Sequence, residues 1–177
     1  LVNFHTWFRH INLKTIYYST VKTPFGIMGI TKSDIGLIRV LFPEEAPFEQ
    51  ALRKVFPNSK IVKNDSACSE IRIQFTEYFS GQRIAFDLIM DLQCPPFYKK
   101  ALKEVKKIPF GKTATYAEIA KRAGNAKAVR AVGSANANNP LPIVIPCHRI
   151  LNTGGDLGGY GGKLERKAYL LELEGSL

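Results

Sequence analysis

The strongest constraint on the fold of this 177-residue chain is a change in the pattern of residue types at positions 94–96, CPP. Before this point, strand-forming residues alternate with turn signals, whereas short helical patterns and glycine-rich loops follow it. We therefore place a domain boundary there. The prediction is an α/β fold class with two domains, residues 1–93 and residues 94–177.

The first half reads as an antiparallel sheet with helices. Strands are predicted at residues 16–18, 26–31 and 36–42, separated by the turn signals TPFG at 23–26 and SDIG at 33–36. Apolar side chains at helical spacing then predict two helices. The first covers Phe48 to Phe56, and the second runs from about residue 66 to residue 79, before Gly81.

The second half contains a pair of short helices that follow a first helix at 97–107. Thr115 and Glu118 have the spacing of a capping box, which starts a helix that Gly124 closes. A second helix, rich in small residues, is predicted at 126–137. Two short helices joined by a tight turn are typical of a helix-turn-helix, although any helical hairpin has this pattern.

The charge of the chain favours a polyanionic partner. The formal net charge is +10 and the pI is about 9.6, so nucleic acid is the expected class of partner. The alternative is a solvated helix face, because five lysines recur at helical spacing: Lys99, Lys100, Lys103, Lys106 and Lys107. The small residues of the second helix suit close approach in the minor groove, with Arg130 as its long cationic side chain.

The spacing of the cysteines and the short length of the apolar runs exclude several classes of protein. No CxxC pair and no apolar run of about 18 residues occurs, so neither a zinc ribbon, a redox dithiol nor a membrane span is expected. Cys68 and Cys94 either pair with each other or serve as small buried side chains, and we favour the second reading. Polar residues near the amino terminus argue against a signal peptide, so a soluble intracellular protein is expected.

Cys147 is the candidate nucleophile. The run at 142–145, PIVI, predicts a short buried strand that would hold Cys147 rigidly at its end. A neighbouring His148 or Arg149 would lower the thiol pKa. The alternative is a buried core cysteine beside a core histidine. Neighbouring strand residues point to opposite faces, so His148 would reach the thiol only through a turn at Pro146 or a bridging water.

The second half resembles the O6-alkylguanine-DNA alkyltransferases, also called methylated-DNA–protein-cysteine methyltransferases. The resemblance rests on ordered motifs, and the first half matches only loosely. These motifs are NPLPIVIPCHRI at 139–150, IPFGK at 108–112, TYAEIA at 115–120, RAVG at 130–133, GGYGG at 158–162 and LLELEG at 170–175.

This resemblance implies both a fold and an activity. It implies a ribonuclease H-like amino-terminal domain and a helical carboxyl-terminal domain with a winged-helix-like helix-turn-helix. The activity is a single, irreversible transfer of an alkyl group from O6-alkylguanine in double-stranded DNA to Cys147, without a cofactor. O4-alkylthymine as a second substrate is left open. A monomer that binds the minor groove is expected, located in the cytoplasm or, in a eukaryote, in the nucleus.

The resemblance also implies the residues that act. The alkyl carbon is attacked by Cys147, His148 takes the thiol proton through a water, and Glu174 orients the histidine. Tyr116 crowds the target phosphate and donates to guanine N3. The DNA-binding residues are Arg130, which fills the space of the extruded base, together with Tyr116, Ala131, Gly133 and Ser134; the alternative for Arg130 is a phosphate or salt-bridge contact.

The same resemblance implies the walls of the substrate pocket. Asn139 ties the recognition helix to the active-site turn, Tyr160 forms a wall, and the carbonyls of Cys147 and Ile150 accept from the guanine amino group. Gly161 stands where some members have a serine, so only its backbone amide faces O6. Asn136 replaces a longer apolar side chain of the family.

The sequence also bears on metal binding and on two other functions. The zinc site of some members requires thiols that this chain lacks, despite His5 and His10, so no metal is expected. A non-catalytic module that recognises alkylated bases would not need Cys147. A cysteine hydrolase would need an oxyanion hole and would leave the helix-turn-helix unexplained.

Overall fold

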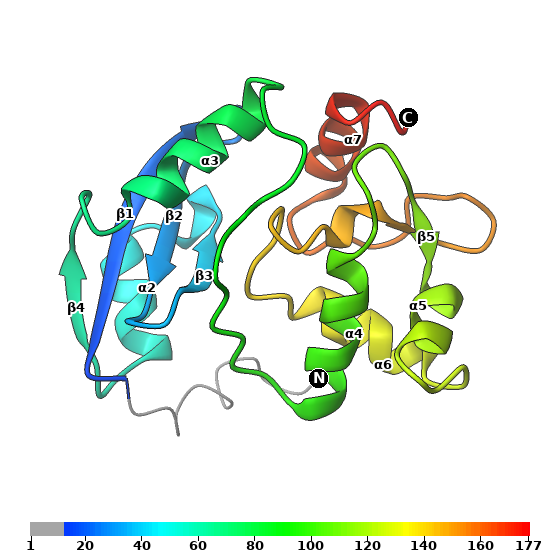
Figure 1. Ribbon diagram of the computed structural model, residues 1–177, viewed down its shortest axis with the longest axis horizontal. Coiled ribbons are helices and arrows are strands. Elements are labelled where there is room, and N and C mark those ends of the chain that lie inside the picture. The colour runs from blue at the N-terminus through cyan, green and yellow to red at the C-terminus, as the bar shows by residue number, and fades with distance from the viewer. Residues whose placement is uncertain (1–12) are drawn as a thin grey trace. The chain divides into compact units, whose positions relative to one another are not determined.

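The computed structural model describes residues 13–177, and the chain divides into two compact units between Gln93 and Cys94. The first unit contains a four-stranded sheet with the strand order β3-β2-β1-β4 (Figure 1). Its strands are β1 (Thr15–Thr23), β2 (Gly26–Lys32), β3 (Leu37–Leu41) and β4 (Lys60–Lys63).

Three strands of this sheet form the predicted meander. β1 pairs antiparallel with β2 around a turn in which Gly26 has a φ of 106°, and β2 pairs antiparallel with β3. The fourth strand was not predicted. β4 pairs in parallel with β1, with Thr15 opposite Lys60, so the sheet is mixed rather than wholly antiparallel.

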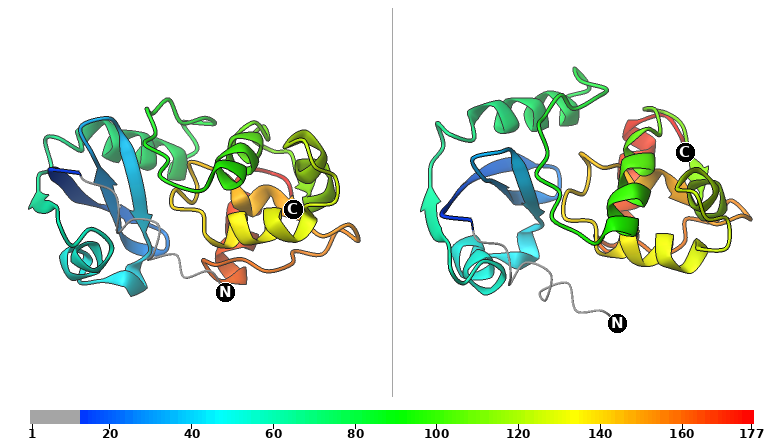
Figure 2. Two further views of the ribbon diagram at one scale, coloured as in Figure 1. Left: turned by 90° about the horizontal axis from the view of Figure 1, so that it is seen from below. Right: turned by 60° about the horizontal axis from the view of Figure 1, so that its bottom comes forward.

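Helices cover both faces of the sheet. Helix α2 (Phe48–Val55) and helix α3 (Ser69–Phe79) lie on opposite faces, and a 3-10 turn, η1 (Pro43–Glu45), precedes α2 (Figures 1 and 2). The core between the sheet and α2 consists of buried apolar residues from each element: Ile16, Tyr18, Ile38, Leu41, Phe48, Leu52, Val55, Phe56 and Ile61. Helix α3 begins at Ser69 rather than at residue 66 and ends before Gly81, which has a φ of 75°.

The second unit is mainly helical. Helices α4, α5 and α6 pack against one another and form the predicted helix-turn-helix with its supporting helix (Figure 1). The elements are α4 (Pro96–Lys106), β5 (Ala114–Thr115), α5 (Tyr116–Arg122), α6 (Val129–Ala137), the 3-10 turn η2 (Cys147–Arg149), β6 (Ile150–Leu151) and α7 (Leu164–Leu173).

The capping box at the start of α5 is confirmed. The Thr115 hydroxyl accepts from the Glu118 amide at 3.2 Å, and the Glu118 carboxylate accepts from the Thr115 amide at 2.6 Å. Gly124, with a φ of 92°, lies in the turn after the helix. The second helix is shorter than predicted, because α6 begins at Val129 rather than at residue 126.

A two-stranded parallel pair connects the helix-turn-helix to the candidate nucleophile. In this pair, Ala114 of β5 lies opposite Ile150 of β6. The pairing places the start of α5 beside the segment that follows Cys147. Within residues 13–177, no helix has the combination of length and apolar character that a membrane span requires.

Candidate active site

A cavity of about 250 Å³ in the second unit contains the candidate nucleophile in its wall. Residues from α5, α6, η2 and the loop before α7 line it. They are Tyr116, Gly133, Asn136, Ala137, Cys147, Gly159, Tyr160 and Gly161. Much of the predicted site is therefore assembled here from segments that are far apart in sequence, while Asn136, Ala137 and Gly159 were not predicted as site residues.

The segment that carries Cys147 is a turn, so the predicted strand at 142–145 is wrong. Pro142 and Ile145 form only an isolated bridge, and Ile143 has a φ of 76°. The Ile145 amide donates to the Leu141 carbonyl at 2.8 Å, which closes the turn. Pro142 within the run and Pro146 directly after it lack the N–H donors that a strand ladder needs. The β-branched side chains are nevertheless buried, which is why the sequence resembles a core strand.

Asn139 fixes the position of the nucleophile. Its side-chain nitrogen donates to the Cys147 sulfur at 3.1 Å and to the Ile145 carbonyl at 2.9 Å. Its side-chain oxygen accepts from the Leu141 amide at 3.0 Å. Asn139 lies two residues after the end of α6 and so connects this helix to the turn. It is not among the residues that line the cavity, where it was predicted.

The Cys147 thiol is buried and protonated. Burial raises its pKa, and the hydrogen bond from Asn139 and the positive charge of Lys167 oppose this rise only in part. The expected lowering of the thiol pKa by neighbouring cationic groups is therefore wrong for the free protein. A thiol in this state needs a base to remove its proton during attack.

His148 supplies a base of defined tautomer. Its Nε2 lies 2.9 Å from Oε1 of Glu174, and both side chains are fully buried. Burial lowers the pKa of His148 more than Glu174 raises it, so the ring is neutral. Because Nε2 donates to the Glu174 carboxylate, Nδ1 carries the lone pair. Nδ1 is buried, without a hydrogen-bond partner among the described residues.

Arg149 holds the Glu174 carboxylate instead of acting on the thiol. Its Nε and Nη2 donate to the two carboxylate oxygens at 2.7 and 2.8 Å, and its Nη1 donates to the Ile108 carbonyl at 2.6 Å. The guanidinium also lies over the Phe110 ring, 5.8 Å from its centre. Glu174 thus bonds to both of the residues that follow Cys147, and the turn at 108–111 is tied to the same cluster.

Lys167 is a buried residue that sequence reasoning missed. Its Nζ donates to the Ile150 carbonyl at 2.6 Å and to the Leu157 carbonyl, and its side chain is fully buried. Burial lowers its pKa to about 8. The sequence holds a signal for this position, because Lys167 precedes Leu170 and Leu171 by three and four residues, which places it on the buried face of α7.

The predicted DNA-binding residues lie along α6 and its neighbour α5. Arg130 and the more buried Ala131 are at the start of α6, and Arg130 is exposed. Gly133 lines the cavity, and a Cβ added there would meet open space. The Ser134 hydroxyl accepts from the Tyr98 hydroxyl at 2.6 Å, so α4 already engages it.

Ile150, which was predicted in the pocket, lies elsewhere. It is fully buried, it does not line the cavity, and its carbonyl accepts from Lys167. Tyr160 and Gly161 do line the cavity, as predicted, and a Cβ added at Gly161 would lie 3.6 Å from the Ala137 carbonyl.

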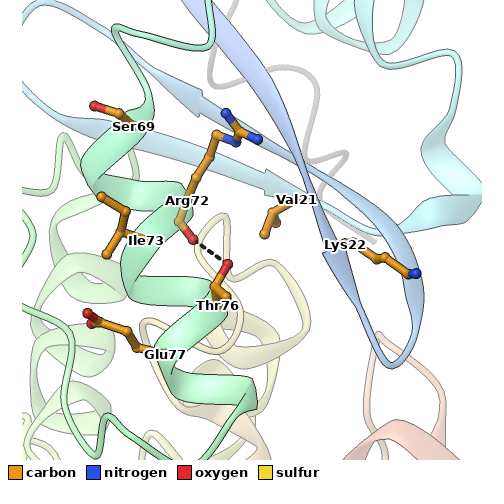
Figure 3. Close-up of a pocket in the computed structure, with 7 residues that line it drawn as sticks. All are labelled: Val21, Lys22, Ser69, Arg72, Ile73, Thr76 and Glu77. Atoms are coloured by element: carbon orange, nitrogen blue, oxygen red, sulfur yellow. Dashed lines mark hydrogen bonds between the residues drawn. The ribbon is translucent and has the colours of Figure 1, made fainter.

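A larger cavity, of about 650 Å³, lies in the first unit between β1 and α3 (Figure 3). Its walls carry no cysteine or histidine, and the Thr76 hydroxyl donates to the Arg72 carbonyl within it. The lining residues are Val21, Lys22, Ser69, Arg72, Ile73, Thr76 and Glu77. This cavity has neither a thiol nor an imidazole base in its lining, so the cavity at Cys147 is the candidate active site.

The other two cysteines do not line the cavity at Cys147. Cys68 and Cys94 are free thiols; Cys68 is buried as expected, whereas Cys94 is only partly buried. Among residues 13–177, no group of three or more His, Cys, Asp or Glu side chains is arranged to hold a metal ion. His5 and His10 lie outside the described residues.

Comparison with known proteins shows relatives over both units. Two family models match: the ribonuclease-like domain of 6-O-methylguanine DNA methyltransferase at residues 16–92, and the DNA binding domain of the same protein at residues 96–176. A methylated-DNA–protein-cysteine methyltransferase of Methanosarcina acetivorans is 37% identical over 161 residues, covering 91% of this chain and 99% of the relative. The constitutive enzyme of that name from Bacillus subtilis is 37% identical over 159 residues, covering 89% and 94%.

Solved structures agree in fold. The O6-methylguanine methyltransferase of Mycobacterium tuberculosis matches with a TM-score of 0.79 and 34% identity, covering 92% of this chain and 94% of that one. The structure of M. tuberculosis OGT in complex with DNA also matches with a TM-score of 0.79, covering 90% and 93%. Because the family models and these relatives span nearly the whole chain, the protein belongs to the 6-O-methylguanine DNA methyltransferase family.

Proposed function

We propose that this protein repairs alkylated DNA by moving an alkyl group from guanine O6 to its own Cys147, once per molecule. The observation that carries the proposal is a buried thiol in the wall of a cavity, followed directly by a neutral histidine that a buried carboxylate orients. Relatives that match nearly the whole chain carry the name methylated-DNA–protein-cysteine methyltransferase, which supports the reaction class.

The proposed reaction balances without a cofactor. The Cys147 sulfur attacks the alkyl carbon, a carbon–sulfur bond forms, and the bond between this carbon and guanine O6 breaks. The thiol proton passes to Nδ1 of His148 through a water, and the Glu174 carboxylate stabilises the charged ring. The electron pair of the broken bond stays with guanine, which takes up one proton overall. The products are an S-alkylcysteine and an unmodified guanine.

Access to the alkyl carbon requires extrusion of the nucleotide, because a base inside the duplex hides its O6 substituent from any side chain. We propose that α6 lies in the minor groove, where Ala131, Gly133 and Ser134 allow close approach. Exposed Arg130 fills the space left by the base, and Tyr116, which lines the cavity, crowds the target phosphate and donates to guanine N3 as the base leaves the stack. The protein is proposed to act as a monomer in the cytoplasm, or in the nucleus of a eukaryotic host.

The test is mass spectrometry after mixing the protein with a duplex that contains O6-methylguanine. The expected product is one methyl group on the peptide that contains Cys147. Cys147→Ser is expected to show no methylation while keeping its DNA affinity, because phosphate contacts come from other residues. Methyl transfer by Cys147→Ser, or a methyl group on another residue, would contradict the proposal.

A further inference from the structure

The positive charge of the chain is concentrated in the second unit. Residues 94–177 carry 14 of the 25 cationic side chains and 6 of the 15 acidic ones, which gives a formal charge of +8 against +2 for residues 1–93. In the first unit, several cations are compensated, because Arg53, Arg72 and Arg83 each have a carboxylate within 4.0 Å. The second unit therefore determines which polyanions the protein attracts.

Helix α4 and the residue that caps its end carry half of the excess charge of the second unit, with five lysines and one acidic residue. The acidic residue, Glu104, pairs with Lys107 at 2.6 Å. Among residues 13–177, no other carboxylate lies within 4.0 Å of these lysines. Four of the five are exposed and Lys106 is half-buried; the others are Lys99, Lys100, Lys103 and Lys107. The folded protein thus leaves most of this charge uncompensated.

Three of these residues, Lys100, Lys103 and Lys107, form a lysine row along α4. They recur at spacings of three and four residues, so they share one face of the helix, and all three are exposed. The opposite face of α4 packs against α5 and α6. Its buried residues are Ala101, Leu102 and Val105. The lysine row therefore faces away from the helix-turn-helix.

The face of α6 that is proposed to enter the minor groove lies on another side of the unit. Arg130 is exposed on α6, whereas Val132 and Ala135 are buried. Figure 1 shows α4 crossing α6 at a steep angle, and the Tyr98 hydroxyl near the start of α4 donates to Ser134 of α6 at 2.6 Å. The far end of the lysine row lies about 13 Å along the helix axis from Tyr98. A duplex held by α6 therefore leaves the row open to a second polyanion.

The backbone of duplex DNA suits the lysine row in charge and in length. It carries one negative charge about every 1.7 Å along its axis, and lysines that replace its counterions bind it without reading the sequence. The row extends over about 10 Å, so it can meet several phosphates.

We propose that the lysine row of α4 binds the backbone of a second DNA segment while α6 holds the first, so that the protein passes directly from one duplex to another. This inference rests on the proposed placement of α6 on DNA and adds a second surface for the same partner. It does not involve the cavity at Cys147.

The experiment follows release of a fluorescently labelled, undamaged duplex after unlabelled duplex is added at increasing concentrations. Simple dissociation has a rate constant that does not depend on the competitor concentration, whereas direct transfer makes the rate constant rise in proportion to it. The α4 variant is Lys100→Gln/Lys103→Gln/Lys107→Gln. The matched control removes the same charge from exposed lysines of the first unit and is Lys54→Gln/Lys60→Gln/Lys63→Gln.

For the wild type and the control, we expect the release rate constant to rise linearly with competitor concentration. For the α4 variant, the slope of this rise should fall about tenfold. Its value extrapolated to zero competitor should stay at that of the wild type, because α6 still holds the first duplex.

Three results would overturn the second surface: a wild-type rate constant that does not depend on competitor, an unchanged slope in the α4 variant, or an equal fall of the slope in both triple variants. A raised value at zero competitor with an unchanged slope would also overturn it, because the row would then contact the same duplex as α6. Failure of the wild type to bind the labelled duplex would instead overturn the proposed function.

Discussion

His148 and Glu174 form a fully buried pair in which Nε2 of the ring lies 2.9 Å from Oε1 of the carboxylate. The pair fixes the tautomer of the ring, because a nitrogen that donates to the carboxylate leaves the other nitrogen as the acceptor. Burial raises the pKa of the Cys147 thiol, so we expect proton removal to accompany formation of the carbon–sulfur bond. We propose that His148 is the base that accepts this proton.

Removal of this base tests the coupling. His148→Gln is expected to slow alkyl transfer by about 10²- to 10⁴-fold, the usual contribution of a positioned general base. DNA affinity should be unchanged, because His148 is fully buried. Single-turnover kinetics with labelled duplex give the rate constant. A loss of less than threefold would show that another group accepts the proton.

Arg149 should matter for stability, because it compensates the buried Glu174 carboxylate. Arg149→Met removes the guanidinium that bonds to both oxygens of this carboxylate, and we expect the free energy of unfolding to fall by about 3–5 kcal/mol. The double variant Arg149→Met/Glu174→Gln should recover part of the loss, since it no longer buries an anion. Urea unfolding measures both values. A fall below about 1 kcal/mol for Arg149→Met would show that Arg149 does not compensate the buried Glu174 carboxylate.

Arg130 is expected to act only on duplex DNA. Arg130→Ala should slow repair of O6-methylguanine in a duplex much more than reaction with the free base, because only the duplex leaves a space to fill. The residue is exposed, so the free energy of unfolding should change by less than about 0.5 kcal/mol. Lys54→Ala, an exposed lysine on α2 in the first unit, controls for loss of one positive charge. Equal slowing on both substrates would make Arg130 a structural residue.

The lowered pKa of Lys167 predicts how the free energy of unfolding depends on pH. Burial lowers its pKa from 10.5 to about 8, so between these values the unfolded chain holds a proton that the folded protein lacks. The free energy of unfolding therefore rises with pH across this window on account of Lys167. The difference in this free energy between the wild type and Lys167→Met should increase from pH 8 to pH 10.5. A difference that stays flat or falls would show that the pKa is not lowered.

Local patterns were sufficient to predict several elements. The capping box of Thr115 and Glu118 involves residues close in sequence, and the hairpin between β1 and β2 forms around its own turn. Such interactions depend on side chains whose separation the sequence states directly. The motif around Cys147 likewise singled out a residue that lines a cavity, although its backbone conformation was predicted wrongly.

Contacts between distant segments could not be predicted in the same way. Strand β4 pairs with β1 across a long separation, and its short sequence contains charged residues at both ends. Arg149 and Glu174 are 25 residues apart, and nothing in either local pattern specifies that they meet. The engagement of the Ile150 carbonyl by Lys167 depends on how α7 packs, which only the folded unit shows.

One protein molecule is expected to repair one lesion and then to remain alkylated. A thioether offers no good leaving group, and the residues that line the cavity include only one thiol, Cys147. An alkyl group added to this buried sulfur also overfills its surroundings, which typically costs about 1–3 kcal/mol, so the alkylated form should melt at a lower temperature.

Titration of labelled O6-methylguanine duplex against a fixed amount of active protein is the most direct test. We predict that label transfer stops at one methyl group per molecule, with all of it on Cys147, and that the product melts below the free protein. An unchanged melting temperature would contradict only the packing argument. Continued release of repaired DNA beyond one equivalent per active site would contradict the account of a single, irreversible transfer.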